Sequence, residues 1–132
     1  MSTAILHNVK PTRRCLIVDD SKMIRRVAGR ILKDLNFDAV EAGNGQEALD
    51  ICRSDMPDAI LLDWNMPVMD GLTFLKALRA EQSAKDPIVV FCTAERDVTK
   101  IAQALDAGAD EYVMKPFDSD IIESKFLQAG LL

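Results

Sequence analysis

Histidine and cysteine are scarce in this chain of 132 residues, which has one histidine and three cysteines. A lone imidazole can form neither a histidine-rich zinc site nor a catalytic pair with a second one, so we expect His7 to be a surface residue. The three cysteines, Cys15, Cys52 and Cys92, are widely spaced and lie within apolar runs. That pattern is typical of reduced, buried thiols and disfavours a disulfide framework or a zinc site.

Long apolar runs and an excess of positive charge are missing as well. The longest apolar runs have four or five residues, far fewer than the roughly 20 that span a bilayer. Residues 1–14 contain no apolar stretch resembling a signal peptide. The formal net charge of −5 argues against non-specific nucleic-acid binding, which requires clustered positive charge. We therefore expect a cytoplasmic protein that neither inserts into membranes nor binds nucleic acid. We also expect a monomer.

The length and the hydrophobic content of 48% fit one domain with its own core. Residues 1–12 show no periodic pattern and include Lys10-Pro11, so we expect a flexible N-terminal tail there and a folded domain at residues 13–132.

Short apolar runs alternate with amphipathic segments along that domain. The runs typical of strands cover residues 15–18, 37–42, 58–63, 88–92 and 111–114. Each is followed by apolar residues at helical spacing. Strict alternation predicts parallel strands joined by right-handed crossovers, hence a doubly wound (βα)5 sandwich of three layers in the α/β class.

The helical spacing also predicts which residues face the sheet. In the first helix the inward face consists of Met23, Ile24, Val27, Ala28, Ile31, Leu32 and Leu35. In the fourth, at about residues 97–107, it includes Val98, Ala102 and Leu105.

Polar residues end four of the strands. They are Asp19, Asp20, Asp63, Thr93 and Lys115. The carboxyl ends of parallel strands share one edge of the sheet, which is where such sheets bind ligands. We therefore expect these five side chains to meet in one shallow pocket.

Three carboxylates in one pocket repel one another unless a cation is bound. Oxygen ligands favour a hard ion, with Mg2+ ahead of Ca2+ or Mn2+. Lys115 can pair with a phosphoryl oxygen, and the hydroxyl of Thr93 can donate to another. The carboxylate of Asp63 can attack phosphorus to form an acyl phosphate, so the pattern predicts phosphoryl transfer to Asp63.

The sequence resembles a receiver domain of bacterial two-component signalling, of the single-domain chemotaxis-response-regulator (CheY-like) type. The resemblance extends from about Arg13 to the C-terminus and implies a flavodoxin-like fold with strand order 2-1-3-4-5. The residues that carry it are Asp19-Asp20, Leu62-Asp63-Trp64-Asn65-Met66-Pro67, Met69-Asp70-Gly71, Thr93-Ala94 and Lys115-Pro116-Phe117.

The resemblance implies that a histidine kinase or histidine phosphotransfer protein phosphorylates Asp63. It also implies that Mg2+ is held by Asp20, Asp63 and the backbone carbonyl of Asn65, with Asp19 acting through water. Thr93 and Lys115 would bind the phosphoryl group. The Lys115–Pro116 peptide bond would be cis.

The resemblance further implies that phosphorylation moves Thr93, turns Tyr112 inward and prepares the surface of the fourth helix, fifth strand and fifth helix for a partner protein. Because no effector domain follows, we expect output through protein contact, or through passing the phosphoryl group on as a relay intermediate or phosphate sink. We also expect Asn65 and Glu95 to tune self-dephosphorylation.

Two other functions fit parts of the pattern. A phosphatase could use Asp63 as nucleophile, but such enzymes commonly place an aspartate two residues further on, where this chain has Asn65. A flavodoxin-like cofactor protein would need a phosphate-cradling loop after the first strand, where Asp19-Asp20-Ser21 stands instead.

The first helix carries a stripe of basic residues, which include Arg25 and Arg26. This stripe is either a solvated face or the docking surface for a kinase or phosphotransfer protein. The sequence does not identify the cognate kinase, the downstream target or the pathway.

Overall fold

The computed structural model describes residues 13–81, 83, 85–94 and 98–132, and over these residues five strands alternate with five helices. The strands are β1 (Arg13–Val18), β2 (Phe37–Ala42), β3 (Ala59–Leu62), β4 (Ile88–Thr93) and β5 (Glu111–Met114). The helices are α2 (Lys22–Asp34), α3 (Gly45–Ser54), α4 (Gly71–Ala80), α5 (Val98–Asp106) and α6 (Ser119–Gln128). The predicted alternation is confirmed.

All strand pairs are parallel, and the sheet has the order β2-β1-β3-β4-β5. The chain runs from β1 outward to β2 and then returns across β1 to β3, so the strand order reverses between β1 and β3. In sheets of this kind, the crevice at the reversal is the ligand-binding position. The fold and strand order expected from the sequence are confirmed.

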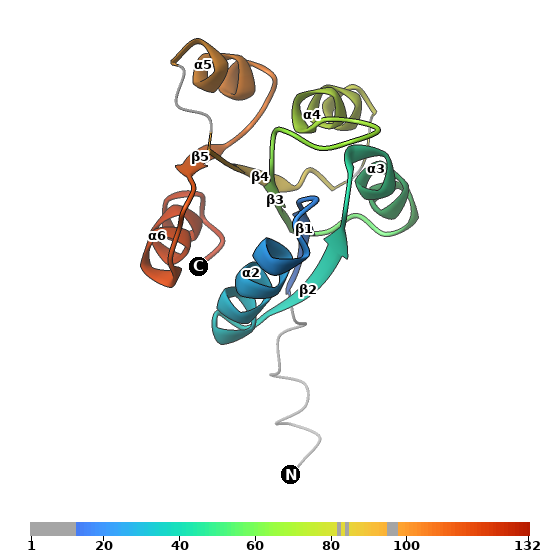
Figure 1. Cartoon of the computed structure of the whole chain (residues 1–132). Coiled ribbons are helices and arrows are strands. Elements are labelled where there is room, and N and C mark those ends of the chain that lie inside the picture. Colours follow the sequence, from blue (N-terminus) through green and yellow to red (C-terminus); the bar gives the residue numbers. More distant parts are fainter. Residues whose placement is uncertain (1–12, 82, 84, 95–97) are drawn as a thin grey trace.

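Helices cover both faces of the sheet (Figure 1). Helices α2 and α6 pack with the core residues of one face, and α3, α4 and α5 pack on the other. The four apolar residues of β3 are all buried, as expected for a central strand with helices on both sides. The sandwich therefore has three layers, with a separate core on each face of the sheet.

Four helices begin directly after a side chain that caps them. The side chain of each capping residue accepts a hydrogen bond from the backbone N–H three residues further on; the residues are Ser21, Asn44, Asp70 and Asp118. Such caps satisfy N–H groups that have no partner within the helix. All four caps lie in the loops that follow strands, at the edge where the strands end.

Two predicted helix faces are correct only in part: Ala28, Ile31 and Leu32 of α2 are buried as expected, but other residues predicted to face the sheet are exposed. In α2, Met23 and Val27 are 74% and 44% exposed. In α5, Val98 and Leu105 are 77% and 46% exposed, Ala102 is exposed too, and Ala104 is the buried residue. The small side chain of Ala104 packs into the core, so the larger apolar residues of α5 lie on its outer face.

The three cysteines are buried and unpaired, as predicted. Burial raises the pKa of Cys92 to about 12 and the pKa of Cys52 to about 11, so neither thiol ionises near neutral pH. In the described part of the chain, no helix has the length and apolar character needed to cross a membrane.

Candidate functional site

Three carboxylates meet at the carboxyl ends of β1 and β3. Val18 and Leu62 are register partners in the sheet, so the residues that follow them, Asp19 and Asp63, lie next to each other. One carboxylate oxygen from each of Asp19, Asp20 and Asp63 lies within 4.8 Å of the other two. Asp19 and Asp63 are 3% and 8% exposed, whereas Asp20 is open to solvent. The structure therefore brings together the predicted acidic cluster.

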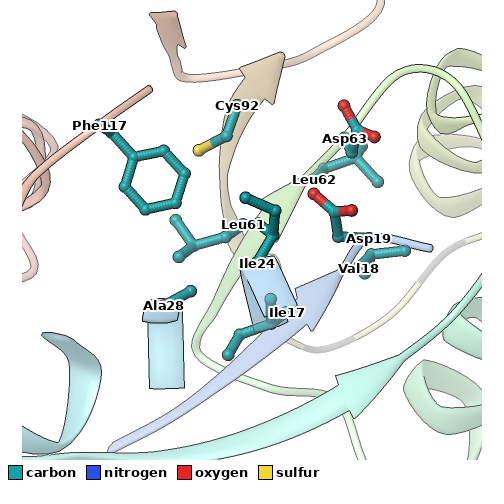
Figure 2. A pocket seen from close by; sticks show the side chains of 10 residues that line it. All are labelled: Ile17, Val18, Asp19, Ile24, Ala28, Leu61, Leu62, Asp63, Cys92 and Phe117. Carbon is teal, nitrogen blue, oxygen red and sulfur yellow. The ribbon is translucent and has the colours of Figure 1, made fainter. Parts of the chain in front are cut away.

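The floor beneath these carboxylates is apolar (Figure 2). It includes Ile24 from α2, Cys92 from β4 and Phe117 from the loop before α6. The cavity there has a volume of about 10 Å³, which is room for about one water molecule. A phosphoryl group would therefore have to bind on the solvent side of Asp19 and Asp63.

Lys115 supplies positive charge to the cluster. Its Nζ atom lies 2.5 Å from Oδ2 of Asp19 and 3.4 Å from Oδ1 of Asp63. Burial alone would lower the pKa of Lys115, but the bond to Asp19 and the charges of both carboxylates outweigh burial and raise it. The raised pKa keeps Lys115 protonated at neutral pH.

Opposing effects also act on the pKa of Asp63, but here burial outweighs the neighbouring positive charge. Burial raises the pKa of its carboxyl group, and the charge of Asp19 adds to that effect. The charge of Lys115 and the N–H of Trp64 act against it, but the net pKa remains raised. An additional cation in the cluster would favour the carboxylate form of Asp63.

Thr93 ends the strand next to β3 in the sheet. It is the last residue of β4, is 1% exposed, and pairs in register with Met114. The backbone N–H of Lys115 donates to the carbonyl of Thr93 over 3.0 Å, and the Lys115–Pro116 peptide is cis, as expected. Thr93 and Lys115 therefore stand at the carboxyl ends of adjacent strands.

Tyr112 lies on β5, half-buried, two residues before the end of the strand. Its ring stacks on Phe91 at a centroid distance of 6.3 Å, and Phe91 contacts Trp64 at 5.1 Å. Aromatic contacts thus connect the residue after Asp63 with β5. The sequence did not indicate Phe91 and Trp64 as connecting residues, because only the register of the strands places them together.

The loop between β3 and α4, residues 63–70, is held at both ends by glycines. Gly71 donates its N–H to the carbonyl of Trp64, and Gly45 donates to the carbonyl of Met69, each over 2.9 Å. A Cβ atom on Gly71 would lie 2.0 Å from the carbonyl oxygen of Asp63. The absence of a side chain at residue 71 therefore allows α4 to begin directly against Asp63. Asn65 is exposed in this loop.

Arg25 has a position that the sequence did not predict. Its Nε atom lies 2.9 Å from Oε1 of Glu41, and its Nη1 atom donates to the backbone carbonyl of Asp19 over 2.7 Å. Arg25 therefore fixes the backbone of Asp19 through a hydrogen bond. Arg26 is exposed. Glu95, the second expected tuning residue, lies outside the described residues.

The donor set fits a hard divalent cation. It consists of carboxylate oxygens, two of them from buried residues at a distance from one another that one ion can bridge. Magnesium and calcium bind such oxygens, and magnesium commonly combines one or two carboxylates with phosphate oxygens. A site with one lysine and three carboxylates has enough negative charge for such an ion.

Comparisons with known proteins agree with this geometry. The family described as response regulator receiver domain matches residues 15–126. Chemotaxis protein CheY of Pseudomonas aeruginosa is 39% identical over 113 residues, which cover 85% of this chain and 91% of that protein. CheY-3 of Vibrio cholerae is 37% identical over 113 residues, covering 85% and 87%.

Solved structures show the same similarity. CheY4 of Vibrio cholerae superimposes with a TM-score of 0.83 at 30% identity, over 89% of this chain and 98% of that one. The CheX-CheY-BeF3-Mg complex of Borrelia burgdorferi matches with a TM-score of 0.82 at 25% identity, over 91% and 90%.

Proposed function

Because the chain belongs to the response regulator receiver domain family, we propose that Asp63 is the phosphoacceptor of a CheY-like signalling switch. Receiver domains of this kind act in two-component signalling through phosphorylation. One observation carries the assignment of the site: Asp19, Asp20 and Asp63 converge with Lys115 at the strand-order reversal.

The contacts of the two buried acids, Asp19 and Asp63, favour Asp63 as the acceptor. Oδ1 of Asp19 accepts the N–H of Ser21 over 2.9 Å, and Oδ2 of Asp19 contacts Lys115. Both oxygens of Asp19 are therefore engaged within the protein. Asp63 lies at the end of the central strand β3, and its contact with Lys115 is longer, at 3.4 Å. A carboxylate oxygen of Asp63 is thus the better placed nucleophile.

The reaction is a transfer of one phosphoryl group. A carboxylate oxygen of Asp63 attacks the phosphorus of a phosphohistidine or a small acyl phosphate, and the bond from phosphorus to the donor breaks with its electron pair on the donor. Lys115 offsets charge on one phosphoryl oxygen, and the Thr93 hydroxyl donates to another. Catalysis of this kind depends on positioning and charge stabilisation.

A bound Mg2+ ion would neutralise part of the negative charge of the phosphoryl oxygens. The residues proposed to hold it are Asp20, Asp63 and the backbone carbonyl of Asn65, with Asp19 acting through water; Mn2+ could substitute. The similar complex from Borrelia burgdorferi combines CheY with CheX, BeF3 and Mg2+, and this supports the proposal for the present chain.

The proposed output surface consists of α5, β5 and α6. Val98, Leu105 and Met114 expose apolar side chains there, with 77%, 46% and 44% of their surface accessible. Thr93 and Tyr112 would connect this surface to Asp63, since Thr93 ends the strand that carries Phe91, and Phe91 stacks on Tyr112. Phosphorylation would bias a two-state surface toward binding a target protein.

The proposed donors are a histidine kinase or a histidine phosphotransfer protein, docking on α2. Exposed Met23, Arg26 and Val27 form an apolar and basic surface there. Arg25 is not included in this docking surface, because it donates a hydrogen bond to the backbone carbonyl of Asp19 and so positions the site itself. Asn65, exposed two residues after Asp63, is proposed to tune self-dephosphorylation, together with Glu95.

Phosphorylation by acetyl phosphate with Mg2+ tests the proposal. The wild-type protein should take up about one phosphoryl group per chain, Asp63→Asn should take up none, and the exposed-site control Asp38→Asn should match the wild type. Chelation of the metal should stop uptake. Repeated release of phosphate from an excess of a phosphomonoester would contradict a switch and support a phosphatase.

A further inference from the structure

The indole ring of Trp64 has a charged neighbour from another element. Nζ of Lys100, on α5, lies 5.6 Å from the ring centroid. Trp64 is 6% exposed and Lys100 is partly buried. An ammonium group within about 6 Å of an aromatic centroid is attracted to the ring face, most strongly for tryptophan, and more so where water is excluded.

The backbone of Trp64 is tied to Asp63. Its N–H acts on the Asp63 carboxylate and offsets part of the rise in pKa that burial causes there, and its carbonyl accepts the N–H of Gly71 over 2.9 Å. A shift of the Trp64 ring would therefore move a residue whose backbone N–H acts directly on the carboxylate of Asp63.

Several described contacts fix helix α5 near its C-terminal end. Ala104 is its buried residue, and the N–H of Ala109 donates to the carbonyl of Ala104 over 3.0 Å. Arg79 donates from Nη2 to the carbonyl of Gly108 over 2.8 Å, just beyond the helix. Near the start of α5, Val98 is 77% exposed, whereas Lys100 joins the helix to the ring of Trp64.

We propose that Lys100 is a positioning residue that couples helix α5 to the phosphoacceptor through the ring of Trp64. The proposal rests on the function proposed above and adds a contact to it. Coupling between two sites is reciprocal. A partner that holds α5 would therefore influence the chemistry at Asp63 through this contact, and a phosphoryl group on Asp63 would influence the position of α5.

Lys100→Met tests the charge separately from the packing, because methionine keeps an unbranched apolar stem and removes the ammonium group. Lys100→Arg keeps the positive charge and should behave as wild type. Gln103→Met introduces the same side chain at an exposed position of the same helix and is the matched control.

The first measurement is amide hydrogen exchange of the metal-free protein. In Lys100→Met the amides of α5 should exchange about threefold to tenfold faster, the factor expected from losing a partly buried cation–π contact. Exchange in β1 and β3 should not change. Unchanged exchange in α5, or an equal increase throughout the sheet, would overturn the proposal.

The second measurement compares the free protein with the protein loaded with Mg2+ and beryllofluoride. Trp64 is the single tryptophan of the chain, so its emission reports loading directly. In the wild type, loading should change both this emission and exchange in α5. In Lys100→Met the emission change should persist while the response of α5 falls at least twofold, and Lys100→Arg should restore it.

The outcomes separate the two proposals. A wild-type protein that shows no change with Mg2+ and beryllofluoride would overturn the proposed function, and the coupling with it. A wild-type response that Lys100→Met reproduces in full would overturn the coupling alone. In a Trp64→Leu background Lys100→Met should have little further effect on α5, and full additivity there would also contradict the proposal.

Discussion

Lys115 contacts Asp19 more closely than Asp63, with its Nζ atom 2.5 Å from Oδ2 of Asp19 and 3.4 Å from Oδ1 of Asp63. In this state the lysine neutralises the neighbour of the proposed acceptor. Before phosphorylation, Lys115 and a divalent cation would therefore compete for the negative charge of Asp19 and Asp63. After phosphorylation, both cations would be needed to offset the charge of the phosphoryl group.

Lys115→Met should separate metal binding from phosphorylation. Removing the ammonium group removes a competing cation, so Mg2+ should bind at least as tightly as in the wild type. Uptake from acetyl phosphate should fall about a hundredfold, the usual effect of losing one preorganised group that stabilises the transition state. Titration of Trp64 emission with Mg2+ and the initial rate of phosphorylation measure the two effects. Loss of Mg2+ binding would show instead that Lys115 holds the acidic cluster together.

Gly71→Ala should destabilise the protein, whereas Gly29→Ala should stabilise it. A Cβ atom on Gly71 would lie 2.0 Å from the carbonyl oxygen of Asp63, but one on Gly29 would meet no atom closer than 4.0 Å. The first change should lower the free energy of unfolding by about 1–3 kcal/mol, as overpacking does. The second should raise it by about 0.5–1 kcal/mol, because alanine favours the helix. Urea unfolding of both variants checks the pair, and a stable Gly71→Ala protein would contradict the close approach.

Val68→Asn should stabilise the loop after Asp63. Val68 has a φ of 70°, and the N–H of Met69 donates to the carbonyl of Pro67 over 2.7 Å, which forms a strained γ-turn around a β-branched residue. Asparagine tolerates this conformation better and should raise the free energy of unfolding by about 1 kcal/mol. Val98→Asn, another exposed valine, should give no such gain in the same unfolding experiment. An equal change in unfolding free energy for Val68→Asn and Val98→Asn would show that backbone strain at Val68 does not explain the effect.

Arg26→Glu should slow phosphorylation by a cognate histidine kinase or phosphotransfer protein. The side chain is exposed on α2, so its reversal should change association without changing the site. Uptake from acetyl phosphate should remain that of the wild type, and the control Lys76→Glu, on the exposed side of α4, should leave both rates unchanged. A loss with both donors would show that Arg26 acts on the site and not on docking.

The sequence predicted the alternation of strands and helices and the placement of the polar residues at the strand ends. It could do so because buried parallel strands are short apolar runs, and because their carboxyl ends must share an edge. The acidic pair and Asp63 could therefore be placed together without any contact being known.

Other features depend on tertiary contacts that periodicity does not encode. Helical spacing assigned Val98 and Leu105 of α5 to the core, but the helix packs through the smaller Ala104. Arg25 was assigned to a basic stripe, yet α2 lies where this arginine reaches the carbonyl of Asp19. The contact between Lys100 and Trp64 spans two elements far apart in the sequence, and no local pattern could have indicated it.

The central claim is that Asp63, and not its acidic neighbours, accepts the phosphoryl group. Borohydride reduces an aspartyl phosphate to homoserine, so the acceptor can be identified by mass spectrometry of peptides from the wild-type protein after treatment with acetyl phosphate and Mg2+. The account predicts homoserine at residue 63 alone. Conversion at Asp19 or Asp20, or no conversion in protein that binds Mg2+, would contradict it.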